Sequence, residues 1–167
     1  MIKLINNIKY LFQFIIISTF MFVFKFLGLN ISRLISGKIL SLIGPFFRSN
    51  LITLNNINLA FPKENKKFKK KIIYNMWLTY GKIFAEYNFM RNFRSQLETE
   101  KIEIEGQEEL EKIKIANQPV VFISGHFDNF ELMAMHIEKS GVDLAVIYRP
   151  LNNVFLNPLM ENIRKKY

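Results

Sequence analysis

The sequence has no cysteine. This absence excludes a disulfide, a thiolate nucleophile and a cysteine-based metal site, and it suits a reducing compartment. No low-complexity linker and no internal repeat divides the chain. Its 167 residues, 50% of them apolar, are enough for one ordinary domain with a sizeable core.

Acidic residues are almost missing from the first part of the chain. Residues 1–97 hold 15 Lys and Arg against two acids, Glu64 and Glu86, which gives +13; residues 98–167 hold 8 against 12, which gives −4. A basic region beside an apolar leader favours an anionic membrane surface as a partner. Nucleic acid is disfavoured, because no nucleic-acid motif accompanies the charge. The chain is also rich in Lys, Ile and Asn throughout, so biased composition supplies part of the charge.

The apolar leader from Tyr10 to Leu29 carries one charge, Lys25. A bilayer core of ~30 Å needs about 20 apolar residues in a helix, and Lys25 can reach the headgroups along its aliphatic stem. No small-residue cleavage site follows, which disfavours a signal peptide. We therefore predict a membrane anchor over residues 1–30. Lys and Arg are more frequent after it than before it, which favours a cytoplasmic C-terminal side.

Residues 31–97 are expected to form a membrane-associated basic helical region. A first amphipathic helix covers Ile31 to Phe47 and is ended by Gly44-Pro45. A second helix follows a basic run and continues to about Asn92. The lysines of the basic run are Lys66, Lys67, Lys69, Lys70 and Lys71. They form a docking face for phospholipid or for an acidic protein, or they are only the solvated first turn and a half of the helix.

Residues 98–167 read as an α/β region. The stretch 101–106 alternates like a half-buried strand, and a short helix is expected over 107–114. Apolar runs at 120–124 and 142–148 flank a helix from about Asn129 to Lys139, with Gly141 at its end. Two apolar strands joined by a helix form a βαβ unit. We therefore expect an α/β fold: a membrane helix, further helices and a partial parallel or mixed sheet.

His126 follows the first apolar run, and Glu131 comes five positions later. On one continuous helix these side chains would not face each other. They can meet if His126 lies in the loop and Glu131 in the first helical turn, with Asp128 or Asn129 as the N-cap. The carboxylate would then fix the imidazole tautomer, and the other ring nitrogen would deprotonate an attacking hydroxyl.

Other interpretations of these residues stay open. Asp128 and Glu131 also have the spacing of a capping box, and His126 could be a hydrogen-bonded histidine at a strand end. A metal site of His126, Glu131 and His136 is disfavoured by its span, and His136 has the setting of a packing residue. Ser124 lies outside any G-x-S-x-G elbow, so a serine nucleophile is weakly supported.

Arg149 ends the second apolar run. At the carboxyl end of a parallel strand it would be placed to meet phosphate, although a surface loop arginine fits equally well. Arg164 lies in an expected helix near residues 158–166. We include Arg149, Arg164 and Asn129 among the candidate substrate-binding residues.

In order along the chain, these features resemble the late acyltransferases of lipid A biosynthesis, the lauroyl/myristoyl acyltransferase family. The matching pieces are the apolar anchor, Asn58-Leu59-Ala60-Phe61-Pro62, the basic helix with Glu86, Gly106, Gly125-His126-Phe127-Asp128-Asn129-Phe130-Glu131-Leu132, Tyr148-Arg149-Pro150-Leu151-x-Asn153, and the helix with Arg164. A histidine-x4-acid pair alone is a weak signal, whereas the ordered set covers nearly the whole chain.

The resemblance implies an enzyme of the bacterial inner membrane with its catalytic part facing the cytoplasm. Its activity would be transfer of a fatty acyl group from acyl carrier protein to a hydroxyl of a lipid A precursor, with no cofactor and no metal. His126 would be the general base, Glu131 its partner, and Arg164 the arginine that steadies the substrate or the developing oxyanion. Acyl carrier protein is acidic, which gives the lysine run a further partner.

The chain is shorter than the family pattern implies, since it stops at Tyr167, soon after Arg164. We therefore expect residues 98–167 to be the N-terminal part of the acyltransferase domain, truncated at the C-terminus. One rival function is a non-catalytic, membrane-bound remnant. Another is a glycerolipid acyltransferase, which uses a similar pair but usually carries aspartate where Glu131 stands.

Overall fold

The computed structural model describes residues 2–47, 50–95 and 102–165. They form two compact units, one of Met1–Phe20 with Phe89–Tyr167 and the other of Met21–Asn88. These compact units differ from the three regions predicted from the sequence, whose boundaries at residues 30 and 97 divide the chain by expected role. Those boundaries stay a prediction.

The first helix, α1 (Ile2–Phe47), contains a kink at Gly28, where φ is 73° and ψ is 167°. This conformation is essentially restricted to glycine. The kink interrupts the helical hydrogen bonds, and the buried hydroxyl of Ser32 donates to the Phe24 carbonyl across it, at 3.0 Å. The anchor and the first amphipathic helix are thus both helical, as expected. The end predicted at Gly44-Pro45 is wrong, since the helix continues to Phe47.

Within the described part of the chain, one helix is long and apolar enough to cross a bilayer. It covers Leu4–Phe46, with a mean hydropathy of 2.0 in its most apolar window and 11% of that window buried. Core helices and signal sequences pass the same test of length and composition, but a core helix would be mostly covered by its neighbours. The apolar side chains of α1 are instead largely exposed, which agrees with the expected anchor.

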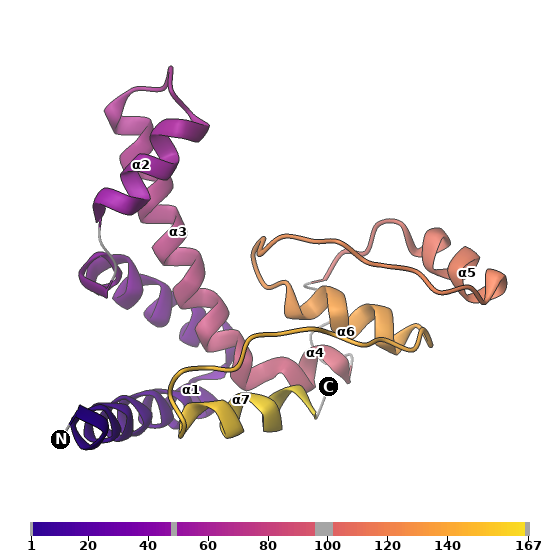
Figure 1. The fold of residues 1–167 in the computed structure, drawn as a ribbon, viewed down its shortest axis with the longest axis horizontal. Helices are drawn as coiled ribbons and strands as arrows, with labels where there is room; N and C mark the ends of the chain where they lie inside the picture. Colours follow the sequence, from indigo (N-terminus) through magenta and orange to yellow (C-terminus); the bar gives the residue numbers. More distant parts are fainter. Residues whose placement is uncertain (1, 48–49, 96–101, 166–167) are drawn as a thin grey trace. The chain divides into compact units, whose positions relative to one another are not determined.

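In the second unit, α2 (Asn50–Ala60) and α3 (Lys66–Glu86) form a helical hairpin (Figure 1). Asn65 caps α3, because its side-chain oxygen accepts a hydrogen bond from the Phe68 amide at 2.9 Å. The sequence did not predict α2, whose asparagines are weak helix formers. Packing overrides that preference, and Ile57 is buried in the hairpin.

The C-terminal half of α1 packs closely on α3 through small residues. A Cβ at Gly81 of α3 would overlap the backbone at Ser36 and lie 2.6 Å from the Gly37 Cα, and one at Gly44 would overlap the Trp77 ring. Beside this crossing, Arg33 pairs with the buried Glu86 at 2.9 Å. Glycine is therefore required where the two backbones approach.

In the first unit, short helices pack around a small apolar core. α4 (Met90–Arg94) lies against α6 (Glu131–Lys139), and their buried residues are Met90, Phe93, Met135 and Ile137. Arg94 pairs with Glu138, and the Lys139 amine donates to the Arg94 carbonyl at 2.8 Å. The pair lowers the pKa of the Glu138 carboxyl, chiefly through the hydrogen bond from Arg94.

Two further helices adjoin α4 and α6. η1 (Tyr87–Phe89) precedes α4. α5 (Gln107–Ala116) contacts α6 through a hydrogen bond between the His136 Nε2 and the Gln107 side-chain oxygen, which lie 2.7 Å apart.

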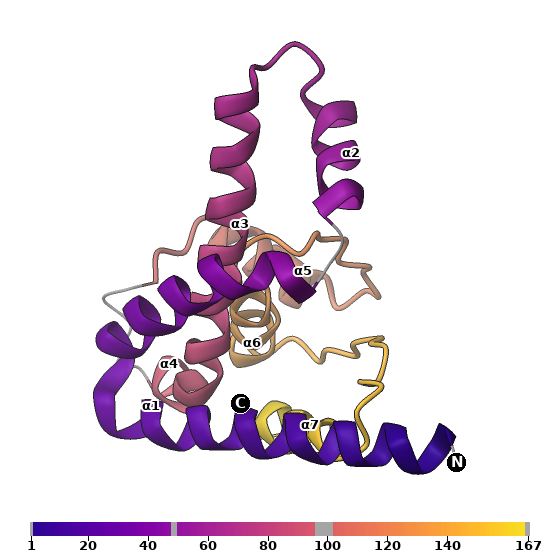
Figure 2. The same ribbon diagram turned by 90° about the vertical axis from the view of Figure 1, so that its left-hand side faces the viewer.

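The last helix, α7 (Leu156–Arg164), lies beside the first part of α1 (Figure 2). Asn153 joins the two. Its amide donates to the Tyr10 carbonyl at 3.0 Å and to Gln13 at 3.1 Å, while its oxygen accepts from the amides of Phe155 and Leu156. This buried side chain thus satisfies the first turn of α7 and holds it on α1.

The predicted sheet is wrong. Among the described residues none lies in a strand, and the runs 120–124, 142–148 and 102–106 adopt no regular structure; residue 101 lies outside the described residues. Val121, Ile123 and Ile147 are 86%, 93% and 102% exposed, so these runs have no apolar face to pack against. Two strands on their own have only marginal stability in water. An apolar run with no buried face to pack against also does not specify with which strand, or in which register, it would pair. The βαβ unit expected from the sequence is therefore absent from this part of the chain.

Gly81→Ala should destabilise the crossing of α1 and α3, because the added methyl overlaps backbone that cannot rotate away. Overpacking of this kind costs about 1–3 kcal/mol. The measurement is the free energy of unfolding from denaturant titration in detergent. Asn75→Ala on the exposed face of α3 is the matched control and should change stability by less than about 0.5 kcal/mol. Equal stability of the two variants would contradict the close approach.

Asn153→Ala should release the start of α7, because four hydrogen bonds lose their side-chain partner. The expected loss is about 2 kcal/mol locally. Amide hydrogen exchange of residues 155–164 measures it. Asn152→Ala removes an exposed side chain from the neighbouring position and should leave that exchange unchanged. Unaltered protection in Asn153→Ala would show that another contact holds α7.

Candidate functional site

The segment before α6 carries His126 in an exposed position. Its ring lies edge-on to Phe130, with centroids 4.4 Å apart and the planes at 65°. The preceding Gly125 has no room for a Cβ, since the Phe127 ring occupies that space. The Phe130 ring therefore covers one edge of the imidazole, while solvent still reaches it.

Glu131 is the first residue of α6 and is 6% exposed. The Nε of Arg164 lies 3.0 Å and 3.3 Å from its two carboxylate oxygens, and a terminal guanidinium nitrogen also donates to it. A guanidinium fork matches a carboxylate in this way. The pair is 33 residues apart in sequence and connects α6 with α7.

The expected positions of the two catalytic candidates agree with the structure. His126 lies in the loop and Glu131 opens the helix. Among the described residues, however, no hydrogen bond or ion pair joins the imidazole to this carboxylate, and the carboxylate is bound by Arg164. The sequence placed both groups at the junction but did not predict that the arginine would bind the acid.

A polar cluster surrounds the guanidinium of Arg164. It lies 5.0 Å from the centre of the Tyr148 ring, and the Tyr148 hydroxyl donates to Glu161 at 3.0 Å. Asn157 donates to the same Glu161 oxygen at 2.7 Å. The hydrogen bond to Glu161 raises the pKa of Tyr148 above its ordinary value. We call Glu131, Arg164, Tyr148 and Glu161 the carboxylate–arginine cluster.

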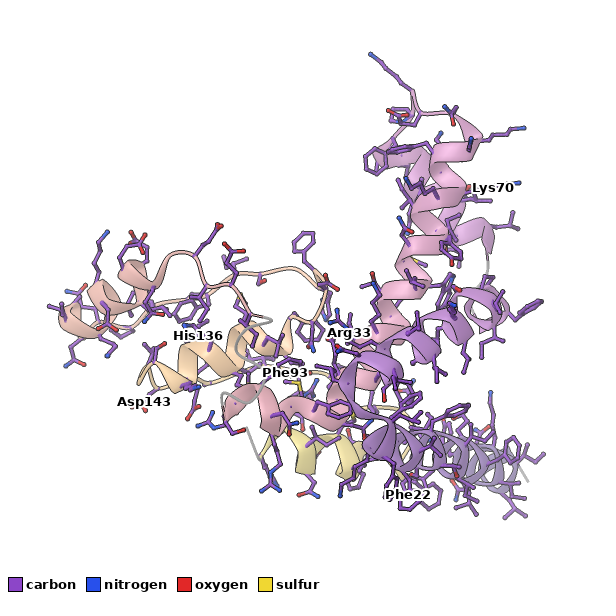
Figure 3. All side chains as sticks on the ribbon, turned by 180° about the vertical axis from the view of Figure 1, so that it is seen from behind. Phe22, Arg33, Lys70, Phe93, His136 and Asp143 are labelled. Atoms are coloured by element: carbon purple, nitrogen blue, oxygen red, sulfur yellow. The ribbon has the colours of Figure 1, made fainter. Side chains whose placement is uncertain are left out.

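The other predicted residues are more scattered. Asn129 lies just before α6 and its amide approaches the Met90 sulfur at 3.9 Å. Arg149 is exposed beside Tyr148. His136 bonds to Gln107, in agreement with its expected packing role (Figure 3). The basic run belongs to α3, in the second unit.

The predicted N-cap of α6 is wrong. Phe130 occupies the cap position with no side-chain hydrogen bond. Asp128 is left-handed, with φ at 45°, and its carbonyl accepts from the Phe130 amide at 3.2 Å. The backbone turn thus replaces the side-chain cap. The end of the helix agrees with the sequence, since Gly141 follows it with φ at 86°.

Sequence reasoning missed the importance of Tyr148, Glu161 and Asn157. A helical signal was available, because Asn157 and Glu161 are four apart and Glu161 and Arg164 three apart on one helix. Nothing local indicated which of them would meet residues 131 and 148.

Among the described residues no group of three His, Asp or Glu side chains could hold a metal ion. The arrangement offers a solvent-accessible imidazole in the loop before α6 and a buried carboxylate, paired with Arg164, at the first residue of α6.

Arg164→Met should destabilise the protein, because it leaves the buried Glu131 carboxylate without its guanidinium. The loss is expected to be about 2–3 kcal/mol, below the full buried value because Arg164 is 30% exposed. Adding Glu131→Gln should restore much of it, since it removes the buried charge that Arg164 no longer neutralises. Denaturant titration of the four proteins of this double-mutant cycle measures the coupling. A double variant as unstable as the sum of both single variants would show no interaction.

Comparison with known protein families matches residues 3–167 to the bacterial lipid A biosynthesis acyltransferases. Neither the curated proteins nor the solved structures give a match. The matched range contains the anchor, the histidine-x4-acid segment and the helix with Arg164. The chain therefore belongs to the bacterial lipid A biosynthesis acyltransferase family, which points to acyl transfer in lipid A biosynthesis.

Proposed function

We propose that this protein is an O-acyltransferase that moves a fatty acyl group from acyl carrier protein to a hydroxyl of a lipid A precursor at the bacterial inner membrane. One observation carries the proposal. The family match includes a segment whose imidazole, that of His126, is exposed in the loop that precedes the buried, arginine-bound Glu131 at the start of α6. An accessible base and a fixed carboxylate are what hydroxyl attack on a thioester requires.

In this mechanism a ring nitrogen of His126 takes the proton of the acceptor hydroxyl as its oxygen attacks the thioester carbonyl. The tetrahedral intermediate then collapses, the carbon–sulfur bond breaks, and the imidazolium returns its proton to the leaving thiolate. An ester and a free carrier thiol result. These steps need a proton carrier and electrostatic stabilisation, and they invoke no cofactor.

Glu131 would stabilise the imidazolium that forms in the first step. This role requires the imidazole to turn from Phe130 toward the carboxylate when substrate binds, and catalytic contacts often tighten at that point. Arg164 then acts first as the group that holds the Glu131 carboxylate in place. Its contact with the developing oxyanion, suggested by the family resemblance, would be a second role for the same guanidinium.

Arg149 is our candidate for contact with phosphate on the precursor. It is exposed and directly follows Tyr148, a member of the carboxylate–arginine cluster. A guanidinium in that position can bind phosphate through two parallel hydrogen bonds. Asn129, in the turn before α6, is the other candidate for contact with the substrate. Both assignments follow from position in the loops around α6.

The inner-membrane location rests on α1. Its exposed apolar surface, from Leu4 to Phe46, suits lipid better than water. The excess of Lys and Arg after the anchor favours a cytoplasmic catalytic side, where acyl carrier protein is available. The second candidate function is a membrane-bound, non-catalytic protein, which is favoured by the His126 ring packing on Phe130 while Glu131 is paired with Arg164.

His126→Ala should lower the transfer rate about 100-fold or more, because loss of a general base costs at least that. The assay uses the full chain in detergent or vesicles, an acyl carrier protein thioester and a lipid A precursor. His136→Gln is the control, since that histidine bonds to Gln107 on α5 and should leave the rate within a few fold. Normal turnover in His126→Ala would reject the mechanism, and no turnover in the unmodified chain would favour the non-catalytic alternative.

A further inference from the structure

The connection between α2 and α3 concentrates positive charge. We call residues 59–71 the hairpin tip. It holds six lysines and a single acid, Glu64; the lysines are Lys63, Lys66, Lys67, Lys69, Lys70 and Lys71. All but Lys69 are exposed, and Figure 3 shows Lys70 near this end of α3. The Lys69 amine instead donates to Asn58 at 2.9 Å and ties the two helices together. Five exposed lysines therefore surround one rigid turn.

The same tip exposes apolar side chains. Leu59 is 82% exposed, Phe61 42% and Phe68 38%. The rings of Phe61 and Phe68 meet edge to face, with centroids 5.7 Å apart, so both are held at the tip. The Phe61 amide bonds to the Ile57 carbonyl at 2.8 Å, which continues α2 to the turn. These apolar residues are thus presented by fixed backbone.

This combination selects one kind of partner. Lysines alone would suit an acidic protein or solvent equally well. Lysines around protruding leucine and phenylalanine match a surface with anionic groups outside and hydrocarbon a few ångströms below, which is an anionic phospholipid bilayer. The charge also has a folding cost, because lysines in the first turn of α3 oppose the helix dipole and no acid offsets them there. Bound anionic headgroups would remove that cost.

We propose that the hairpin tip is a second membrane contact, separate from α1, that binds anionic phospholipid. The lysine amines meet headgroup phosphates, and Leu59 and Phe61 enter the boundary between headgroups and acyl chains. The inference needs no acyl transfer, so it stands or falls independently of the proposed function. It gives the lysine run the membrane as its partner in preference to acyl carrier protein.

The absence of cysteine allows a direct test. Leu59→Cys provides a unique site in the full chain for an environment-sensitive fluorophore. The labelled protein is reconstituted into vesicles containing phosphatidylglycerol and into vesicles of phosphatidylcholine alone. We expect a blue-shifted emission, quenched by lipid-borne nitroxides, in the phosphatidylglycerol vesicles only, and reversed by high salt. Replacing Lys66, Lys67 and Lys70 by Gln should reduce the buried fraction of the probe, roughly fivefold in the equilibrium for each lysine.

Ile115→Cys is the matched control. Ile115 is 84% exposed on α5, among both acidic and basic neighbours, and its probe should stay in water in both vesicles. Circular dichroism confirms that the Gln variant is folded. A Leu59 probe that stays in water with phosphatidylglycerol, that is buried equally in both lipids, or that responds only to added acyl carrier protein would overturn the proposal. Loss of transfer activity with normal tip burial would bear on the proposed function alone.

Discussion

A buried carboxylate must be neutralised where it is buried, and this constraint organises the first unit. Glu131 begins α6 with little exposure to solvent, and Arg164 of α7 supplies the opposite charge. The arginine in turn lies over Tyr148, whose hydroxyl is held by Glu161 of the same helix. Each contact restricts the next, so the segment 142–155, which has no regular structure, is held by side chains at Tyr148 and at Asn153. Removing both members of a buried pair is tolerated better than removing one.

This pairing has a consequence for chemistry: the carboxylate of Glu131 already accepts hydrogen bonds from Arg164. The oxygens of a carboxylate that already accept from a guanidinium have less capacity left to accept from an imidazole. The Arg164 pair thus fixes the acid in place while the imidazole of His126 remains accessible to solvent. His126 meets solvent and Phe130, and any contact it makes with Glu131 depends on a rotation about its own side chain.

Helices were easier to predict than their neighbours. The limits of α5, α6 and α7 agree with the sequence within a few residues, because periodicity and end signals such as Gly141 act locally. The prediction of a sheet was wrong because the sequence of the runs 120–124 and 142–148 shows only that they are apolar. A strand also needs a neighbouring strand with which to form hydrogen bonds. The pairing of residues 131 and 164 was beyond local reasoning for the same cause: it joins elements 33 residues apart. α2 was missed because its asparagines argue against a helix that packing nevertheless stabilises.

Gly28 has a further effect, on how the chain fits a bilayer of given thickness. At about 1.5 Å per residue, the helix from Ile2 to the kink is roughly 39 Å long, which exceeds the ~30 Å hydrocarbon layer. A straight helix would have to resolve that mismatch by tilting along its whole length. With the break at Gly28, the excess can be taken up by inclination of the first segment together with α7, which Asn153 holds on it. The direction of the helix after residue 28 then does not depend on the thickness of the lipid.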